Sequence, residues 1–90
     1  MSNKQIVYGK KFIKSYQKII KSNFSIEKRL KEKVALFLEN QHSAVLRNHK
    51  LKGKLRDFRA FSITGDIRVI YREEKDYYKF IDIGTHSQVY

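Results

Sequence analysis

The sequence has 90 residues, 41% of them hydrophobic, and no cysteine, which suits a single domain spanning 1–90 and excludes disulfides and thiolate metal sites. Its 20 lysines and arginines outnumber 9 acidic residues, so the formal net charge is +11 at pH 7. A field of this strength attracts polyanions, which makes nucleic acid the first expected partner, ahead of an acidic protein or an anionic membrane surface.

The first part of the sequence predicts a strand and two amphipathic helices. Residues 5–8 form a short apolar segment that ends at a glycine, which is typical of a strand. Between Phe12 and Ile20, hydrophobic residues recur at helical spacing, with lysines on the remaining arc. Ser22 and Asn23 interrupt this pattern, and Ser25 is expected to cap a second helix that forms a hairpin with the first. The apolar stripe of the second helix consists of Ile26, Leu30, Val34, Phe37 and Leu38.

The most basic segment follows a polar loop at residues 40–44. Six cationic side chains lie between Arg47 and Arg59, with a single acid at Asp57, and Gly53 allows a sharp turn of the backbone. Phosphate groups are the natural ligands of such a segment. The side chains expected to bind the nucleic-acid backbone are Arg47, Lys50, Lys52, Lys54 and Arg56.

Three strands are expected in the remaining part of the sequence. Residues 59–64 alternate as a strand, and a tight turn leads into a second strand at residues 67–72. The polar run 73–76 makes a turn into residues 77–83, which should pair antiparallel with 67–72. The expected fold is therefore α+β, with an N-terminal strand, a two-helix hairpin and a three-stranded antiparallel sheet whose second face is left for a ligand. The aromatic residues expected in the core include Tyr8, Tyr16, Phe37, Tyr71 and Phe80.

This hairpin should bring together side chains that are far apart in sequence. The end of its second strand, Gly84-Thr85-His86, lies beside the start of the first, Asp66-Ile67-Arg68, because antiparallel partners run head to tail. His86 and Arg68 are therefore expected to be neighbours, and Tyr90 can join them. An arginine holds two phosphate oxygens in a planar fork and an imidazole titrates near neutral pH, so this group suits phosphodiester chemistry.

A resemblance to a known family is carried by His49 to Gly53, Phe58-Arg59, Ile63 to Tyr71 and Gly84 to His86, followed by Tyr90. These segments resemble the RelE/ParE superfamily of toxins from bacterial toxin–antitoxin modules, and its YafQ branch most of all. Members of that branch are ribosome-dependent endoribonucleases that cut messenger RNA in the ribosomal A site. Each is held inactive by a partner antitoxin.

The resemblance implies that the active site contains His49, Asp66, Arg68, His86 and Tyr90. Metal-free RNA cleavage by the 2′-hydroxyl needs a base, an acid for the leaving 5′-oxygen and a cation for the developing charge. We expect His86 to be the acid and Arg68 to stabilise the charge. His49 is preferred to Asp66 as the base, because an exposed aspartate is a weak base at neutral pH. Tyr90 would stack on a nucleobase or support the phosphate.

The sequence departs from the YafQ pattern at two positions, so the proton-transfer roles known for the family cannot all be assigned to residues of this sequence. Relatives carry a histidine where this sequence has Ser62, and a tryptophan where it has Ile67. The alternative function is a ParE-like inhibitor of DNA gyrase, or a toxin that binds nucleic acid without catalysis. His49 and His86 favour the nuclease. No cofactor or metal is expected, since the three histidines show no ligand spacing.

Structural roles for the same residues stay open at this stage. Arg68 could form a cross-strand ion pair with Asp66 or Asp82. His86 could end a strand by bonding to backbone, and Tyr90 could pack at the edge of the core.

The expected partners are the 70S ribosome, messenger RNA, ribosomal RNA and a cognate acidic antitoxin. A charge of +11 invites an acidic, partly disordered protein that wraps the surface. No signal peptide follows Met1, and no apolar run approaches the roughly 20 residues of a membrane span. We therefore expect a cytoplasmic protein without a membrane partner.

Overall fold

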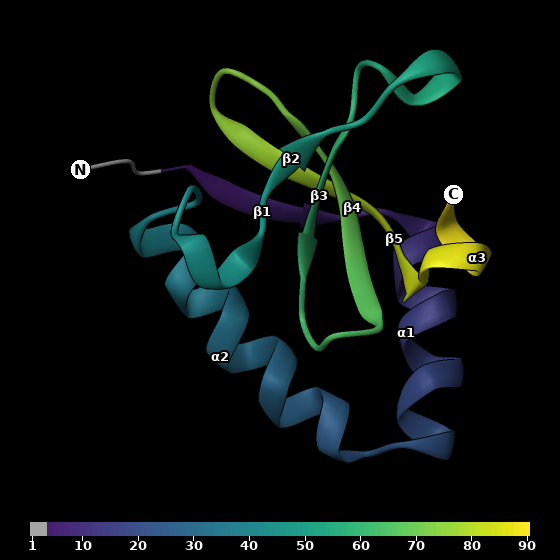
Figure 1. The fold of residues 1–90 in the computed structure, drawn as a ribbon. Helices are drawn as coiled ribbons and strands as arrows, with labels where there is room; N and C mark the ends of the chain where they lie inside the picture. Colours follow the sequence, from purple (N-terminus) through teal and green to yellow (C-terminus); the bar gives the residue numbers. More distant parts are fainter. Residues whose placement is uncertain (1–3) are drawn as a thin grey trace.

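The computed structural model describes residues 4–90 and contains one five-stranded sheet with two long helices on one face (Figure 1). The elements, with η for 3-10 helices, are β1 (Gln5–Tyr8), α1 (Lys10–Ser22), α2 (Ser25–Glu39), η1 (Ala44–Leu46), β2 (His49–Lys50), η2 (Gly53–Leu55), β3 (Arg59–Ser62), β4 (Ile67–Glu73), β5 (Tyr77–Thr85) and α3 (His86–Val89). The strand order is β1-β5-β4-β3-β2, with β1 parallel to β5 and all other pairs antiparallel. The predicted α+β fold is confirmed, and β1 and β2 extend its three-stranded sheet on both sides. Within residues 4–90, no helix is long and apolar enough to span a bilayer.

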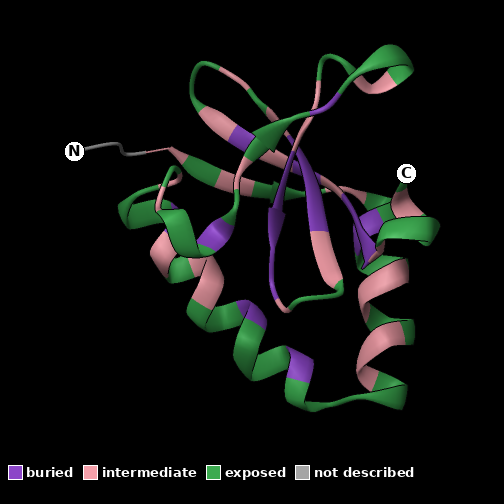
Figure 2. Ribbon diagram, viewed as in Figure 1, coloured by how far each residue is buried: buried purple, intermediate pink, exposed green. Residues whose placement is uncertain are grey.

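The main core lies between the two long helices and the sheet, where Figure 2 shows buried residues along β3, β4 and β5. Phe37 of α2 stacks on Phe61 at 4.6 Å between ring centroids and meets Tyr71 edge-on at 4.9 Å. Edge-to-face and offset pairs of this kind add to the stabilisation from burial. The buried members of this core are Phe12, Leu30, Phe37, Leu46, Phe61, Ile63, Val69, Tyr71, Tyr78, Phe80 and Ile83.

Three expectations for the first part of the chain, β1 to α2, were wrong in detail. Phe24, not Ser25, is the N-cap of α2, and the Ser25 hydroxyl donates to Asn23 Oδ1 at 2.6 Å instead of capping the helix. Tyr8 is 47% exposed and Leu38 43% exposed, although both were expected in the core. The reason is that α1 and α2 splay apart from their connection (Figure 1), which leaves an apolar groove of about 520 Å³ that both residues line.

The second face of the sheet is not left bare, contrary to expectation. Leu51, Ala60 and Ile70 form a small buried cluster there. Leu55 of η2 and Val89 of α3 pack against this cluster, so η2 and α3 lie on this face. A packed apolar cluster therefore lies beside the polar groups at the end of the β4–β5 hairpin.

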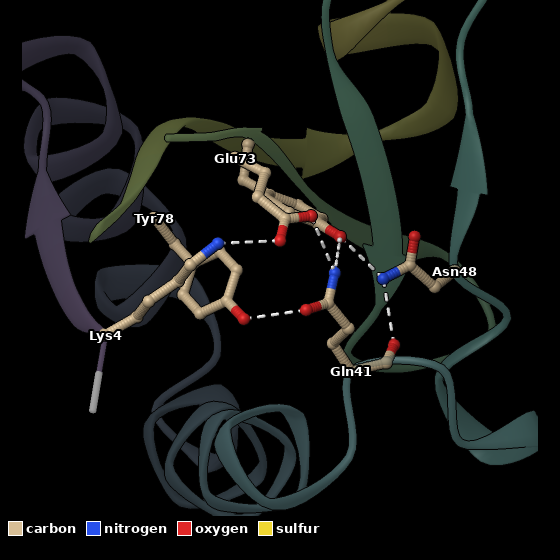
Figure 3. A network of polar contacts seen from close by, with 6 residues as sticks. Lys4, Gln41, Asn48, Glu73 and Tyr78 are labelled. Atoms are coloured by element: carbon tan, nitrogen blue, oxygen red, sulfur yellow. Dashed lines mark hydrogen bonds and ion pairs between the residues drawn. The ribbon is translucent and has the colours of Figure 1, made fainter. Parts of the chain in front are cut away.

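A network of side-chain hydrogen bonds ties the loop after α2 to the sheet (Figure 3). The Tyr71 hydroxyl accepts from Asn48 Nδ2 at 2.6 Å and from Gln41 Nε2 at 3.3 Å. The Tyr78 hydroxyl donates to Gln41 Oε1 at 2.6 Å, and Arg59 Nε donates to Asn48 Oδ1 at 2.9 Å. Because partly buried polar groups are costly when unpaired, this network fixes the path of the chain into β2.

Glu73 carries the negative charge of the network. Lys4 Nζ donates to Glu73 Oε2 at 2.8 Å, and Gln41 Nε2 donates to Oε1 at 3.0 Å. Burial raises the pKa of Glu73, but the hydrogen bonds from Lys4 and Gln41 outweigh this and hold the pKa below its ordinary value of 4.5. A carboxyl group with a depressed pKa stabilises the fold above the unfolded-state pKa, and this contribution is lost as the pH falls through the folded-state pKa.

We expect the free energy of unfolding of the wild type to fall as the pH drops below the ordinary Glu73 pKa of 4.5. In Glu73→Gln this fall should be smaller, because the titrating group is gone. Denaturant titrations of both proteins at a series of pH values measure the difference. If the free energy of unfolding fell equally with pH in the two proteins, the depressed pKa of Glu73 would be contradicted.

Candidate functional site

Arg68, His86 and Tyr90 lie together at the end of the β4–β5 hairpin. Arg68 pairs with Gly84 across the two strands, and His86 begins α3 two residues later. The His86 and Tyr90 rings meet edge-on, with centroids 4.3 Å apart. Burial raises the pKa of the Tyr90 phenol, and the charge of Arg68 and a hydrogen bond from it partly offset this rise. The guanidinium, phenol and imidazole thus form one contiguous group.

The short helix α3 holds the ring of His86 in place. Its N-terminus is a capping box, in which the Thr85 side chain accepts from the Gln88 N–H and the Thr85 N–H donates to Gln88 Oε1 at 2.9 Å. Gly84 of β5 lies against α3, and a Cβ atom at this position would be 2.9 Å from Gln88 Oε1 and 3.1 Å from Val89 Cγ1. A glycine is therefore needed for α3 to lie this close to β5.

We expect Gly84→Ala to displace α3 and separate the His86 and Tyr90 rings. The added methyl group collides with both Gln88 and Val89, so the capping box cannot keep its geometry. Losing a helix cap typically lowers the free energy of unfolding by about 1 kcal/mol, so the variant should still fold. In NMR spectra, the ring-current shift of the His86 protons by Tyr90 should shrink. Ser87→Ala, an exposed change on α3, is the control, and an unchanged His86 signal in Gly84→Ala would refute the packing argument.

Arg68 forms no ion pair within residues 4–90. The Asp82 carboxylate is buried and is held by the Ser15 hydroxyl at 2.7 Å, with Lys11 Nζ at 3.4 Å. Asp66 is exposed in the β3–β4 turn. The structural alternative of a cross-strand ion pair is therefore not realised. Arg68 Nε is buried and lacks a hydrogen-bond partner within the described residues.

Of the two candidate bases, His49 lies apart from this group, whereas Asp66 directly precedes Ile67, which pairs with Thr85, and so lies at the same end of the hairpin as His86. His49 pairs with Ala60 of β3, so β3 separates it from β4, and two strand spacings place its backbone about 10 Å from that of β4. His49 Nδ1 is 3.0 Å from the carbonyl oxygen of Arg47. Since a carbonyl oxygen only accepts, Nδ1 carries the proton of the neutral ring and Nε2 is left as a base. No three or more His, Cys, Asp or Glu side chains within residues 4–90 are grouped to hold a metal ion.

The side chains predicted to bind phosphate lie in three places. Arg47 follows η1 with a left-handed backbone (φ 51°) and lines a cavity of about 250 Å³ at the edge of β3. Lys50 and Arg56 line a separate hollow of about 310 Å³. Lys52 and Lys54 are exposed in the η2 excursion, which leads the chain away from Arg47.

The fold is shared with solved toxin structures. YafQ from Escherichia coli superposes with a TM-score of 0.81 at 22% identity, covering 98% of this chain and 99% of that one. The E. coli DinJ–YafQ complex gives 0.79 at 23% identity, with coverage of 98% and 99%. A metal-bound toxin from Helicobacter pylori gives 0.80 at 29% identity, with coverage of 96% and 98%. The fold of this chain is thus the fold of these toxins.

No curated protein matches the sequence. The sequence profile of a family described as the bacterial toxin of type II toxin–antitoxin system, YafQ, matches residues 4–90. The chain therefore belongs to the YafQ family of type II toxins.

Proposed function

We propose that this toxin is a ribosome-dependent endoribonuclease that cuts messenger RNA in the A site without a metal ion. The observation that supports the proposal is the contiguous group of Arg68, Tyr90 and His86, with an arginine that has no acidic partner within residues 4–90. The net charge of +11 supports it independently, since the substrate is a polyanion.

The proposed reaction is attack by the 2′-hydroxyl oxygen on the adjacent phosphorus. The P–O5′ bond breaks, a 2′,3′-cyclic phosphate remains on the upstream fragment, and His86 gives its proton to the leaving 5′-oxygen. Arg68 binds the non-bridging oxygens as negative charge develops on them. Tyr90, which contacts both residues, positions the imidazole against the guanidinium.

His49 is the proposed acceptor of the 2′-hydroxyl proton, with Asp66 as the second candidate. By strand register, His49 and Arg68 project from the same face of the sheet. Between them, β3 presents only the small side chains of Ala60 and Ser62 on that face.

Purified ribosomes programmed with a defined messenger RNA test this proposal. Primer extension should reveal cuts within the codon in the A site, and the upstream product should end in a 2′,3′-cyclic phosphate. The same RNA without ribosomes should stay intact. Intact RNA on the ribosome, together with inhibition of gyrase supercoiling by the toxin, would support the ParE-like alternative instead.

We also propose an acidic antitoxin as the protein partner. Two lines support it: the family is one of toxin–antitoxin systems, and E. coli YafQ has been solved in complex with DinJ. A surface with a net charge of +11 favours an acidic chain. Copurification from the native operon should recover a small acidic protein in stable complex, and recovery of the toxin alone would count against it.

A further inference from the structure

A polar cavity of about 250 Å³ lies at the free edge of β3. β2 pairs only with Arg59 and Ala60, because the left-handed backbone of Arg47 (φ 51°) turns the preceding chain away from the sheet. The rest of this edge of β3 has no neighbouring strand among the described residues. The cavity is lined by Arg29, Lys33, Val45, Arg47, Ser62, Ile63, Thr64 and Gly65.

Three cationic side chains line this cavity, and no acidic one does. Arg29 and Lys33 lie one turn apart on α2, and Arg47 joins them from the loop after η1. None of the three forms an ion pair within residues 4–90. Like charges around one cavity repel each other, and a bound anion removes that repulsion.

The edge of β3 adds neutral hydrogen-bond donors. The Ile63 N–H donates to the carbonyl oxygen of Ile67 in β4 at 2.8 Å. Because alternate residues of an antiparallel strand direct their N–H groups to opposite sides, the N–H of Ser62 is directed away from β4, toward the free edge. Thr64 Oγ1 accepts from two backbone N–H groups at 3.2 and 3.0 Å, which leaves its own hydroxyl hydrogen available to donate.

We propose that this cavity binds a phosphate group of the RNA backbone, at a site separate from the catalytic group. The identity of the ligand as RNA rests on the proposed function. Ser62 pairs with Arg68 across β3 and β4 and also lines the cavity. An RNA chain whose phosphate is bound by Arg68 therefore reaches the cavity by passing over Ser62. Arg68 lies on β4, one strand spacing of about 5 Å from β3, and none of the residues that line the cavity belongs to the catalytic group, so the cavity is a second anion site beside that group.

The test compares two variants that remove the same charge with the same spacing. Arg29→Gln/Lys33→Gln alters the cavity, whereas Lys14→Gln/Lys18→Gln removes two exposed cations from α1. The probe is a short fluorescent oligoribonucleotide with 2′-deoxy substitutions, which can bind but cannot be cut. Fluorescence anisotropy over a range of salt concentrations gives the affinity, and thermal unfolding verifies that both variants are folded.

We expect the cavity variant to bind the oligonucleotide about tenfold more weakly than the control variant at low salt. The slope of log affinity against log salt should fall by about 0.7 for each single-strand phosphate contact that is lost. Equal affinities and slopes in the two variants would overturn the proposal, as would a wild type that does not bind. Unchanged oligonucleotide binding with weaker antitoxin binding would assign the cavity to the protein partner and also overturn it. Since the probe is not cleaved, the outcome is separate from the ribosome assay, which alone decides the proposed function.

Discussion

Replacing His86 by glutamine is expected to slow messenger RNA cleavage on ribosomes by about 10²- to 10⁴-fold, the usual contribution of a general acid. Glutamine keeps a hydrogen-bonding side chain of similar length but cannot donate the proton that the leaving 5′-oxygen needs. His86 is exposed on the first turn of α3, so the fold should not depend on its ring. Binding of the toxin to ribosomes should therefore remain close to that of the wild type.

His42→Gln is the matched control for this experiment. His42 is exposed in the loop after α2, and within residues 4–90 it makes a hydrogen bond only through its backbone N–H, to Asn40 Oδ1 at 3.2 Å. The two variants make the same chemical change, one at the proposed site and one outside it. Single-turnover primer extension at saturating toxin separates loss of chemistry from loss of binding. If both variants cleave at the wild-type rate, His86 is not the acid.

Arg68→Lys is the second replacement with a large expected effect, a loss of about 10²- to 10³-fold in the rate of cleavage. Lysine keeps the positive charge but has no planar fork to hold two phosphate oxygens. The side chain also cannot reproduce the contact that Arg68 makes with the Tyr90 phenol. Arg72→Lys, on the same strand and paired with Glu74, is the control and should leave cleavage unchanged.

A second readout of Arg68 does not depend on activity. The charge of Arg68 lowers the pKa of the Tyr90 phenol, partly offsetting the rise that burial causes. Removing that charge in Arg68→Gln disfavours the phenolate, so the pKa of Tyr90 should rise further. Ultraviolet titration of this variant against wild type, with Tyr90→Phe to identify the signal, measures the change. An unchanged or lower pKa would show that Arg68 and Tyr90 are not in contact in solution.

The regular elements of the fold were predictable because each has a repeating pattern of its own. The alternation along β4 correctly directs Val69 and Tyr71 into the main core and Ile70 to the other face. β2 could not be predicted, since two residues show no periodicity and only pairing with β3 defines the strand. The splay of α1 and α2 was equally hidden, because the hydrophobic stripe of a helix reports its buried face but not the angle to its neighbour.

The candidate site was predictable only in the part that follows from chain connectivity. A hairpin brings His86 close to Arg68 in any antiparallel arrangement, and the structure has that arrangement. The helix α3 was missed, although the spacing of Thr85 and Gln88 matches a capping box and could have indicated it. The cavity formed by Arg29, Lys33 and Arg47 has no local signal, because its members come from separate elements and each resembles an ordinary solvated cation.

The parallel pairing of β1 with β5 has a consequence for how the molecule assembles. β5 meets β4 across a short turn at residues 74–76, whereas Gln5 of β1 pairs with Tyr77, a separation of 77 − 5 = 72 positions. The entropy lost in closing a loop grows with its length, and long-range pairing slows folding. Formation of the β4–β5 hairpin, which carries Arg68 and leads into His86, is therefore expected to be the fast step of folding. Pairing of β1 with the outer edge of β5 is expected to be the slow step.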